Sequence, residues 1–522
     1  MSIKSLPENL KGVHLHFVGI KGTGMAALVE ILHNKGAIIT GSDVSDRFYT
    51  DEILEKLGIK ALPFDGNNIT DQVQYVIYSS AYKLDKNPDL RSASRKNVPC
   101  LLYTEALGAY SSRAYSCGIA GVHGKTSTTG LVGSILKEID LPAQVLAGSV
   151  INSFGGSCTY TSPLIKEASA AGIDGAKVEK GEKNIFVAET CEYQRHFMSF
   201  CPQKIILTSV EPDHEDYYPT YEDIREAFID YICKLPIGGE VIYCADDNGA
   251  VDTLEHVAAL RPDIVAVPYG KNAPGEFKLT YGSVENEENK FKIGLFENLG
   301  TDFFKGEFCL SMPGRHEVLD ATAAVALVCM LLRQYGKNPV EYANNIYKGL
   351  KNFSGGKRRS EIVGHFTNKN GEDVLVMDDY GHHPTAVKTT LEGFKEFYKG
   401  RKLIVDFMSH TYSRTQALLT EFSQSFFVAD SLILHKIYSS ARENPSDFNI
   451  TGRTLFDEVL KNSTDQVVYF EEVLDAKDYV IEELNKPLDK EKFPDGYLFV
   501  TMGAGDNWKL GKAILETEEN NN

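Results

Sequence analysis

Seven consecutive residues in the first quarter of the chain have the types and order of a phosphate-binding loop: Gly121, Val122, His123, Gly124, Lys125, Thr126 and Ser127. The apolar run at 114–120 is typical of a buried strand, and residues 128–139 carry apolar side chains at helical spacing. In this layout the loop N–H groups and the helix N-terminus face an anion. Lys125 would reach the outer phosphates, and the Thr126 hydroxyl would hold Mg²⁺. Because Ile119 stands where the usual pattern has its first glycine, an ordinary strand-to-helix turn is the alternative.

Acidic and histidine side chains follow two later strands of the same region. A strand predicted at 184–188 leads to Glu189 and Glu192, and one at 204–209 leads to Glu211, Asp213 and His214. The carboxyl ends of parallel strands meet at one edge of a sheet, where ligands bind in open α/β sheets. We therefore expect these side chains beside the phosphate loop.

A second polar cluster follows strands predicted at 374–377 and 402–407: Asp379, Tyr380, His382, His383, His410 and Arg414. Arg414 could pair bidentately with a carboxylate or a phosphate. A histidine could take a proton from an incoming ammonium group, since nucleophilic attack requires the free amine. The alternative is a surface network whose polar groups satisfy one another.

A glycine-rich βαβ unit opens the chain. A strand at 14–18 enters a turn with Gly22, Thr23, Gly24 and Met25, followed by a helix at 26–35, a strand at 37–40 and Asp43. This is a dinucleotide-type turn with an acid 19 residues after Gly24. Such turns bind many phosphorylated ligands, and tight strand–helix packing is the structural alternative. A later strand at 75–78 brings Ser79 and Ser80 to the same sheet edge.

Composition limits the class of protein. The 522 residues carry a net charge of −18, which argues against a nonspecific nucleic-acid binder. The 43% hydrophobic and 24% charged content is that of an ordinary globular protein of two to four domains. Nine cysteines without a C-x-x-C pair indicate neither a disulfide framework nor a zinc signature. With no signal peptide and no long apolar run, we expect a cytoplasmic protein without membrane insertion.

The alternation of strands and helices predicts an α/β protein with mostly parallel sheets and right-handed crossovers. We expect three domains: a Rossmann-like domain at 1–113, a central phosphate-loop domain at 114–352 and a Rossmann-like domain at 353–522. Residues 161–183 are polar without a clear period, and we expect part of them to be a surface insertion.

The order of these motifs resembles the Mur ligases of bacterial cell-wall synthesis, and among them those that add L-alanine. The resemblance is carried by residues 19–27, 121–127, 189–193, 211–214, 313–316, 357–361, 378–384, 410–414 and 503–506. It implies ATP-dependent joining of L-alanine to UDP-N-acetylmuramic acid through an acyl phosphate, in peptidoglycan biosynthesis. It implies ATP and Mg²⁺ as cofactors, and a monomer or homodimer.

The same resemblance implies roles for individual residues. The first domain would bind the UDP-sugar, through Gly22, Thr23, Gly24, Met25, Asp43, Ser79 and Ser80. ATP would be bound by the phosphate loop, His316 and Arg358 (or its neighbour Arg359), and metal by Thr126, Glu189 and His214. Mn²⁺ could replace Mg²⁺ at the histidine. The amino acid would meet Tyr380, His382, His410 and Arg414, and the catalytic groups would be Lys125, His214, His383 and Arg414.

Several positions depart from the family pattern, including residues 189–193, which read Glu-Thr-Cys-Glu-Tyr where Glu-Ala-Asp-Glu-Ser is commoner. Glu317 stands where the family has an adenine-contacting Asn, and Thr411 stands where many members have Arg. Three alternatives stay open: a related ligase that attaches a recycled tripeptide to the same sugar nucleotide, a nicotinamide-dependent dehydrogenase, and a nucleotide-switched binding protein with slow ATPase activity.

Overall fold

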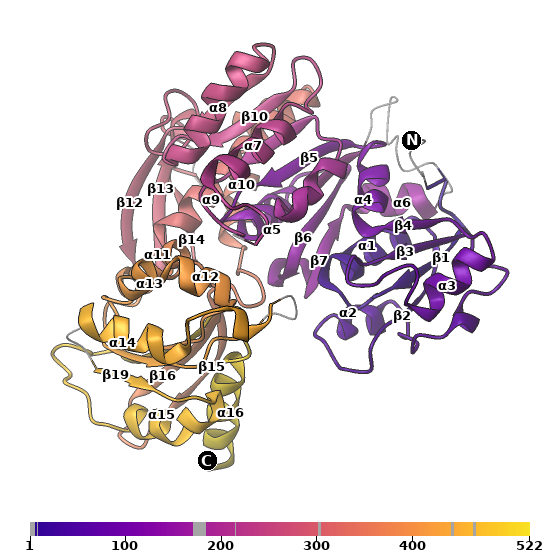
Figure 1. Cartoon of the computed structure of the whole chain (residues 1–522). Helices are drawn as coiled ribbons and strands as arrows, with labels where there is room; N and C mark the ends of the chain where they lie inside the picture. The colour runs from indigo at the N-terminus through magenta and orange to yellow at the C-terminus, as the bar shows by residue number, and fades with distance from the viewer. Residues whose placement is uncertain are drawn as a thin grey trace.

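The computed structural model describes residues 6–7, 9–170, 184–214, 216–300, 304–439, 443–462 and 466–521. Figure 1 shows three units that follow one another along the chain, coloured indigo, magenta to salmon, and orange to yellow. Within the described residues the strands form four sheets. Most neighbouring strands are parallel, and helices connect most successive strands. The predicted three-domain α/β class is confirmed.

The first sheet is parallel throughout, in the order β2-β1-β3-β4. Its elements are β1 (His14–Val18), α1 (Thr23–Asn34), β2 (Ile38–Ser42), α2 (Asp51–Lys56), β3 (Tyr75–Tyr78), α3 (Pro88–Arg95), β4 (Cys100–Leu102) and α4 (Tyr103–Ser111). β1 and β3 have the predicted bounds, because short apolar runs ending in turn residues mark buried parallel strands. The three-residue β4 was not predicted.

The central sheet has the order β11-β10-β9-β5-β8-β6-β7, with β7 antiparallel to β6. Its strands are β5 (Tyr115–Ala120), β6 (Ala143–Ile151), β7 (Ser157–Thr161), β8 (Ile185–Glu189), β9 (Lys204–Leu207), β10 (Glu240–Cys244) and β11 (Val265–Tyr269). The helices are α5 (Lys125–Lys137), α6 (Pro163–Ala170), α7 (Tyr221–Ile232), α8 (Asn248–Leu260), α9 (Arg315–Gln334) and α10 (Ala343–Lys351). β5, which precedes the phosphate loop, lies between β9 and β8, so the acids after both strands flank the loop.

A small antiparallel sheet, β12 (Leu279–Glu285), β13 (Glu288–Ile293) and β14 (Phe308–Leu310), departs from the parallel pattern. Neither β12 nor β13 was predicted. Asn286 and Glu287 join β12 to β13 with φ values of 52° and 56°, the left-handed pair of a tight hairpin turn.

The C-terminal sheet has the order β15-β16-β20-β17-β18-β19, with only the edge strand β15 antiparallel. Its strands are β15 (Glu361–Thr367), β16 (Asp373–Asp379), β17 (Arg401–Phe407), β18 (Ser431–Leu434), β19 (Gln466–Tyr469) and β20 (Gly496–Met502). The helices are α11 (Pro384–Phe397), α12 (Tyr412–Ala417), α13 (Leu419–Ser423), α14 (Gly452–Asn462), α15 (Lys477–Leu484) and α16 (Trp508–Asn521).

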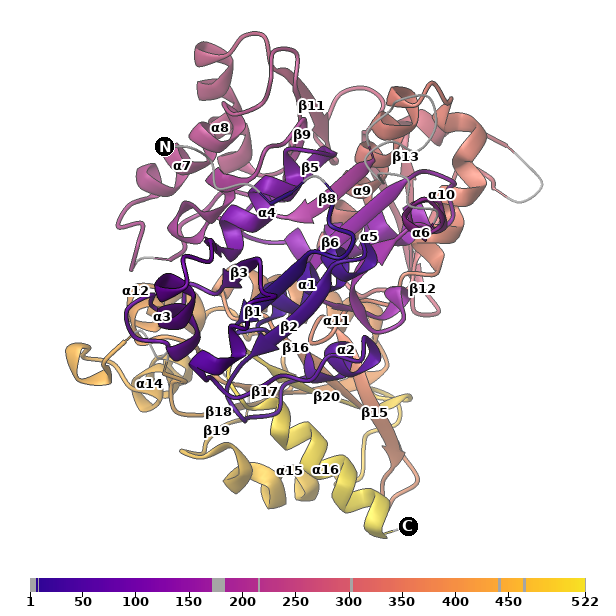
Figure 2. The same cartoon turned by 90° about the vertical axis from the view of Figure 1, so that its right-hand side faces the viewer.

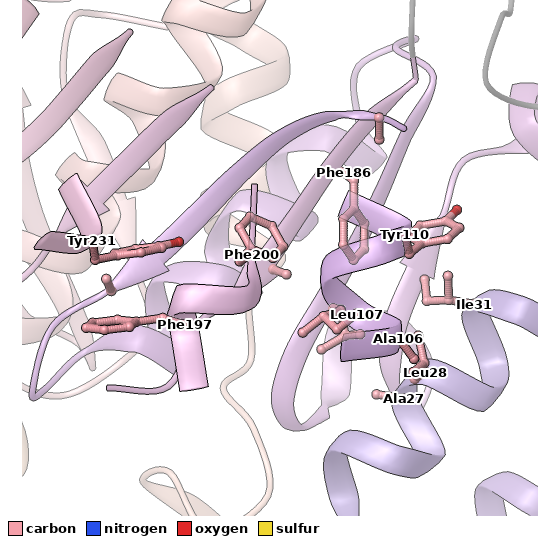
Figure 3. Close-up of a cluster of buried hydrophobic side chains, with 14 of the residues drawn as sticks. Ala27, Leu28, Ile31, Ala106, Leu107, Tyr110, Phe186, Phe197, Phe200 and Tyr231 are labelled. Carbon is pink, nitrogen blue, oxygen red and sulfur yellow. The ribbon is translucent and has the colours of Figure 1, made fainter. Parts of the chain in front are cut away.

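One hydrophobic core joins the first domain to the central one. Figure 3 shows Leu28 and Ile31 of α1 and Leu107 of α4 close to Phe186 and Phe200, which belong to the central domain. Figure 2 shows the same packing from the side, with α1 lying over β6, which it contacts. Burial of large apolar side chains contributes about 1.5–3 kcal/mol each, so this shared core fixes the two domains together.

Part of the segment 161–183 was predicted to be a surface insertion, and only its first ten residues are described. Thr161 ends β7, and α6 follows at Pro163–Ala170 with Ile165 fully buried, so this part packs into the fold. Residues 171–183 lie outside the described part of the chain. Among the described residues, none of the helices combines the length and the apolar character needed to cross a lipid bilayer.

Candidate active site

The phosphate loop is held in a conformation that only glycine adopts easily. Gly121 has a φ of 137°, and a Cβ there would clash with the Thr208 hydroxyl. Gly124 has a φ of 75° and is the N-cap of α5, which therefore begins at Lys125 rather than at the predicted residue 128. The first N–H groups of α5 consequently face the loop, as an anion site requires.

The loop is anchored to the strand end of β9. The backbone N–H of Val122 donates to Ser209 O and that of His123 donates to Ser209 Oγ, each at 3.0 Å. The Thr208 hydroxyl also contacts the carbonyl group of His123. All these partners belong to the central domain, so the loop is shaped without help from the other two.

Lys125 connects the loop to two side chains of neighbouring strand ends. Its Nζ donates to Gly121 O at 2.5 Å and lies 3.0 Å from Glu192 Oε2. Glu192 Oε1 lies 3.2 Å from His214 Nε2, so one carboxylate bridges the lysine and the histidine. Burial alone would raise the pKa of Glu192, but Lys125 and His214 hold it below its usual value. Glu192 is thus an ionised, buried partner of two predicted catalytic residues.

Thr126 and Glu189, two of the predicted metal ligands, are in direct contact. Thr126 Oγ1 donates to Glu189 Oε2 at 2.9 Å, and the N–H of Gly148 donates to the same oxygen at 2.7 Å. A hydroxyl and a carboxylate oxygen beside a phosphate loop are hard donors of the kind that Mg²⁺ prefers, so the pair fits this ion. His214 contacts Glu192 and Asp213 instead, and does not join the pair in this arrangement.

The start of α9 covers the other side of the loop. Ser127 Oγ donates to Glu317 Oε1 at 2.9 Å, and Glu317 is only 4% exposed. Burial raises the pKa of Glu317 to about 7, with Asp379 adding to the shift. Packing around His316, with the charges of His123 and Arg359 nearby, lowers the pKa of that ring to about 4.

Of the two linker arginines, Arg359 is the one near the loop. Its charge acts on both His316 and Glu317. Arg358 instead donates to Asp378 at 2.7 Å and to Gly503 O at 2.6 Å, within the C-terminal domain. The side chain predicted to reach ATP therefore lies away from the loop here, and its neighbour takes the nearer place.

The second polar cluster lies, as predicted, after the ends of β16 and β17 in the C-terminal sheet. His382 Nδ1 lies 2.9 Å from Tyr380 O, and the rings of His382 and His410 have centroids 6.2 Å apart. Tyr380 stacks under Arg358 and Arg359, with centroid distances of 5.3 and 5.4 Å. Asp379 has a structural role, because it accepts the N–H groups of Ser360 and Gly381 at 2.7 Å each.

Two contacts bring this cluster against the central domain. Arg414 Nη2 lies 2.5 Å from Asp213 Oδ1, and both side chains are almost fully buried. Burial opposes ionisation of Asp213, yet Arg414 and then His214 hold its pKa far below the usual range. In the second contact, Glu211 accepts from the Thr385 hydroxyl at 3.0 Å and lies 3.9 Å from His383 Nδ1. Burial, with His123 nearby, lowers the pKa of His383 to about 4.

The glycine turn of the first domain and Glu189 share a neighbour, Tyr103. Asp43 accepts the N–H of Lys21 at 2.7 Å and the Tyr82 hydroxyl at 3.1 Å, so it closes the turn. A Cβ at Gly24 would lie 2.8 Å from the Tyr103 hydroxyl, whose pKa is raised by burial and by the charge of Glu189. Tyr103 is therefore a neighbour of both the glycine turn and Glu189, the predicted metal ligand.

The other predicted residues of the first domain differ in exposure. The Thr23 hydroxyl contacts the Tyr49 hydroxyl, Gly22 caps α1, and Ser79 and exposed Ser80 follow β3. Met25 is only 3% exposed and packs in the hydrophobic core, so its side chain does not face a ligand.

Three family models cover this chain in order. The Mur ligase catalytic-domain model matches residues 14–115, the Mur ligase middle-domain model matches 119–328, and the Mur ligase glutamate-ligase-domain model matches 358–505. The chain belongs to the Mur ligase family. Its members are ATP-dependent ligases that form amide bonds with release of ADP and phosphate. Membership in a ligase family argues against the dehydrogenase alternative.

Curated relatives match over almost their whole length. The UDP-N-acetylmuramate–L-alanine ligase of Treponema pallidum strain Nichols is 45% identical, with 98% of each chain covered. The enzyme of the same name from Borreliella burgdorferi is 36% identical, over 95% of this chain and 97% of its own.

Solved structures share the fold. The UDP-N-acetylmuramate–alanine ligase from Thermotoga maritima aligns with a TM-score of 0.69 at 22% identity, covering 98% of this chain and all of that one. A murein peptide ligase from Psychrobacter arcticus aligns with a TM-score of 0.60 at 20% identity, covering 98% and 99%.

Proposed function

We propose that this chain forms the amide bond between L-alanine and the carboxylate of UDP-N-acetylmuramic acid, with ATP converted to ADP and phosphate, in peptidoglycan biosynthesis. One observation carries the proposal. A series of contacts runs from the phosphate loop to the polar cluster of the C-terminal sheet. Lys125 contacts Glu192, and Glu192 contacts His214. Asp213, the residue before His214, contacts Arg414. A site that activates a carboxylate with ATP and then presents an amine needs these two regions together.

The chemistry first brings two anions together. A carboxylate oxygen attacks the γ-phosphorus of ATP, which releases ADP and leaves an acyl phosphate. Lys125 and the first N–H groups of α5 would hold the phosphates and balance the charge on the transferring group. Thr126 and Glu189 would hold Mg²⁺, which, when bound, neutralises further phosphate charge. Arg359 supplies a second cation on the α9 side.

The second step forms the amide. The free amine of L-alanine attacks the acyl carbon, and phosphate leaves from the tetrahedral intermediate. Arg414 would bind the alanine carboxylate, which requires that it exchange or share its partner Asp213. His383 would accept a proton from the nitrogen as it attacks the acyl carbon, with Glu211, 3.9 Å away, stabilising the protonated ring. Tyr380, His382 and His410 would line the amino-acid side.

The division of labour follows the proposed domain boundaries, 1–113 for the UDP-sugar, 114–352 for ATP and 353–522 for the amino acid. The shared neighbour Tyr103 supports the first assignment, because it is close to Gly24 of the glycine turn and to Glu189. We also expect a cytoplasmic enzyme that is a monomer or a homodimer.

Phosphate release from ATP and Mg²⁺ with UDP-N-acetylmuramic acid tests the proposal, in three reactions that contain L-alanine, the tripeptide L-Ala-γ-D-Glu-meso-diaminopimelate, or neither. Release that requires both the sugar nucleotide and L-alanine is the expected result. Release only with the tripeptide would assign the chain to the recycling reaction. Release that does not depend on the sugar nucleotide would overturn the ligase assignment.

A further inference from the structure

Three side chains from separate parts of the chain meet beside the phosphate loop. His123 lies in the loop, Glu211 follows β9, and His383 caps α11 of the C-terminal domain. One nitrogen of each ring and one carboxylate oxygen all lie within 4.8 Å of one another. Within the described ranges this is the one group of three His, Cys, Asp or Glu side chains so arranged.

The geometry of the group centres on the carboxylate. Glu211 Oε1 contacts His123 Nε2 and lies 3.9 Å from His383 Nδ1, while the ring centroids of the two histidines are 5.0 Å apart. Glu211 Oε2 accepts from the Thr385 hydroxyl at 3.0 Å, which fixes the carboxylate. With Oε2 held by Thr385, Oε1 is oriented toward both rings. Metal ligands are commonly fixed in this way by hydrogen bonds to residues outside the site.

A second observation points to a ligand at the His383 ring. His383 is only 5% exposed. Its Nδ1 accepts the Thr385 N–H at 3.4 Å, whereas its Nε2 has no hydrogen-bond partner within the described structure. A buried ring nitrogen without a partner has lost its hydrogen bond to water and gained none in exchange, which destabilises the folded state. A cation bound by the ring would remove that cost, whereas the hydrogen bonds of the group alone leave it in place.

The donor set differs from that of the phosphate-loop pair. Two imidazoles and one carboxylate are the ligands of a three-residue zinc site with an open fourth position. Mg²⁺ prefers oxygen donors and strict octahedral geometry, so it should favour Thr126 and Glu189 instead. The two sites are therefore distinguishable by the metal that occupies each.

We propose that His123, Glu211 and His383 form a transition-metal site, suited to Zn²⁺, that bridges the phosphate loop and the C-terminal domain. Because the ligands come from two domains, bound Zn²⁺ ties the domains together in the arrangement described here. The inference does not depend on the identity of the amino-acid substrate. A ring that binds Zn²⁺ is not free for the proton transfer assigned to His383 above, so the Zn²⁺-bound form would not carry out the amide-forming step.

Equilibrium dialysis of the full-length protein against Zn²⁺ in excess Mg²⁺ tests the site, with the visible absorption of bound Co²⁺ as a report of tetrahedral nitrogen and oxygen ligation. We expect one Zn²⁺ per chain. Glu211→Gln and His383→Gln should each weaken binding at least about tenfold, since loss of an outer partner alone costs 10–100-fold at known sites. His256→Gln, which alters a comparable His–Asp pair on α8, should bind as the wild type does.

Two further measurements separate this site from others. His214→Ala should keep the Zn²⁺, because His214 belongs to the predicted nucleotide-metal site. Zn²⁺ should raise the melting temperature of the wild type but not that of His383→Gln, since a ligand that binds only the folded state stabilises it. Circular dichroism verifies that each variant is folded.

Three results would overturn the proposal. These are the absence of Zn²⁺ binding by the folded wild type, binding unchanged in both Glu211→Gln and His383→Gln, and binding lost in His214→Ala but kept in the other variants. None of these bears on whether the chain ligates L-alanine.

Discussion

The phosphate loop and the polar cluster of the C-terminal sheet differ in where their partners come from. The loop is held by Thr208 and Ser209 of its own domain. Arg414 and His383, by contrast, find their charged neighbours Asp213 and Glu211 on the central domain. The loop is therefore shaped within the central domain alone. The polar cluster of the C-terminal sheet gains its charged neighbours only when the C-terminal and central domains are in contact. Domain movement can then control when the second step of a two-step reaction begins.

The largest expected effect concerns the buried ion pair between the domains. Asp213→Ala leaves the Arg414 guanidinium buried without a partner, which typically costs about 3–5 kcal/mol. The free energy of unfolding, measured with denaturant by two probes, should fall accordingly. Glu396→Ala is the matched control, because Arg315–Glu396 also joins the two domains but is exposed, so its loss should cost less than about 1 kcal/mol. Equal effects would mean that the Asp213 pair does not hold the domains.

Lys125→Ala tests the loop side of the comparison. Removing the lysine that contacts the loop carbonyl groups and Glu192 should lower turnover by about 10²–10³-fold, as for loss of a charge-stabilising donor, without unfolding the chain. Lys137→Ala, in the last turn of the same helix, should leave turnover near the wild-type level. A loss confined to stability, with turnover per folded molecule unchanged, would contradict a role for Lys125 in phosphoryl transfer.

Gly121→Ala tests whether the loop is shaped by its own backbone. A Cβ at φ 137° clashes with Thr208, so we expect a loss of roughly 1–3 kcal/mol in stability and weaker ATP binding. Gly58→Ala has a positive φ of 72° but open space around the added Cβ, so it should cost less and leave ATP binding intact. Calorimetry of ATP binding measures both variants, and identical affinities would show that loop geometry is not the cause.

Glu317→Gln comes last because its expected effect nearly vanishes at acid pH and appears only as the pH rises. Because burial raises the folded pKa to about 7 from the ordinary 4.5, the carboxyl destabilises the fold progressively as the pH rises from 4.5 to 7. The glutamine variant should therefore be nearly as stable as the wild type near pH 4.5 and increasingly more stable as the pH rises, with a difference of at most about 3 kcal/mol above pH 7. Melting temperatures across this range measure the difference. A constant difference at all pH values would exclude titration of Glu317 as the cause.

The sequence predicted the parts of the molecule that are encoded locally. The apolar runs before Gly19 and Gly121 marked β1 and β5, and the glycines with Lys125 and Thr126 marked the loop. The hairpin β12–β13 was missed because its turn, Asn286 and Glu287, contains neither proline nor glycine. Period-two alternation in that segment was the available signal.

Partners far apart along the chain could not be predicted. Nothing near Arg414 in the sequence indicates Asp213, and nothing near Lys125 indicates that Glu192 rather than Glu189 is its ion partner. Likewise, Arg358 and Arg359 are adjacent and chemically equal. Which of them faces the loop depends on the left-handed conformation of Arg358, with a φ of 56°, and on its bond to Asp378.

The most direct test of the account follows the oxygen atoms. UDP-N-acetylmuramic acid labelled with heavy oxygen in its carboxylate is converted with ATP, Mg²⁺ and L-alanine, and the released phosphate is analysed by mass spectrometry. If the carboxylate attacks the γ-phosphorus, one labelled oxygen must leave with phosphate when the amine displaces it, so labelled phosphate should form together with UDP-N-acetylmuramoyl-L-alanine. Unlabelled phosphate, or phosphate without the alanine product, would contradict the acyl-phosphate ligase mechanism.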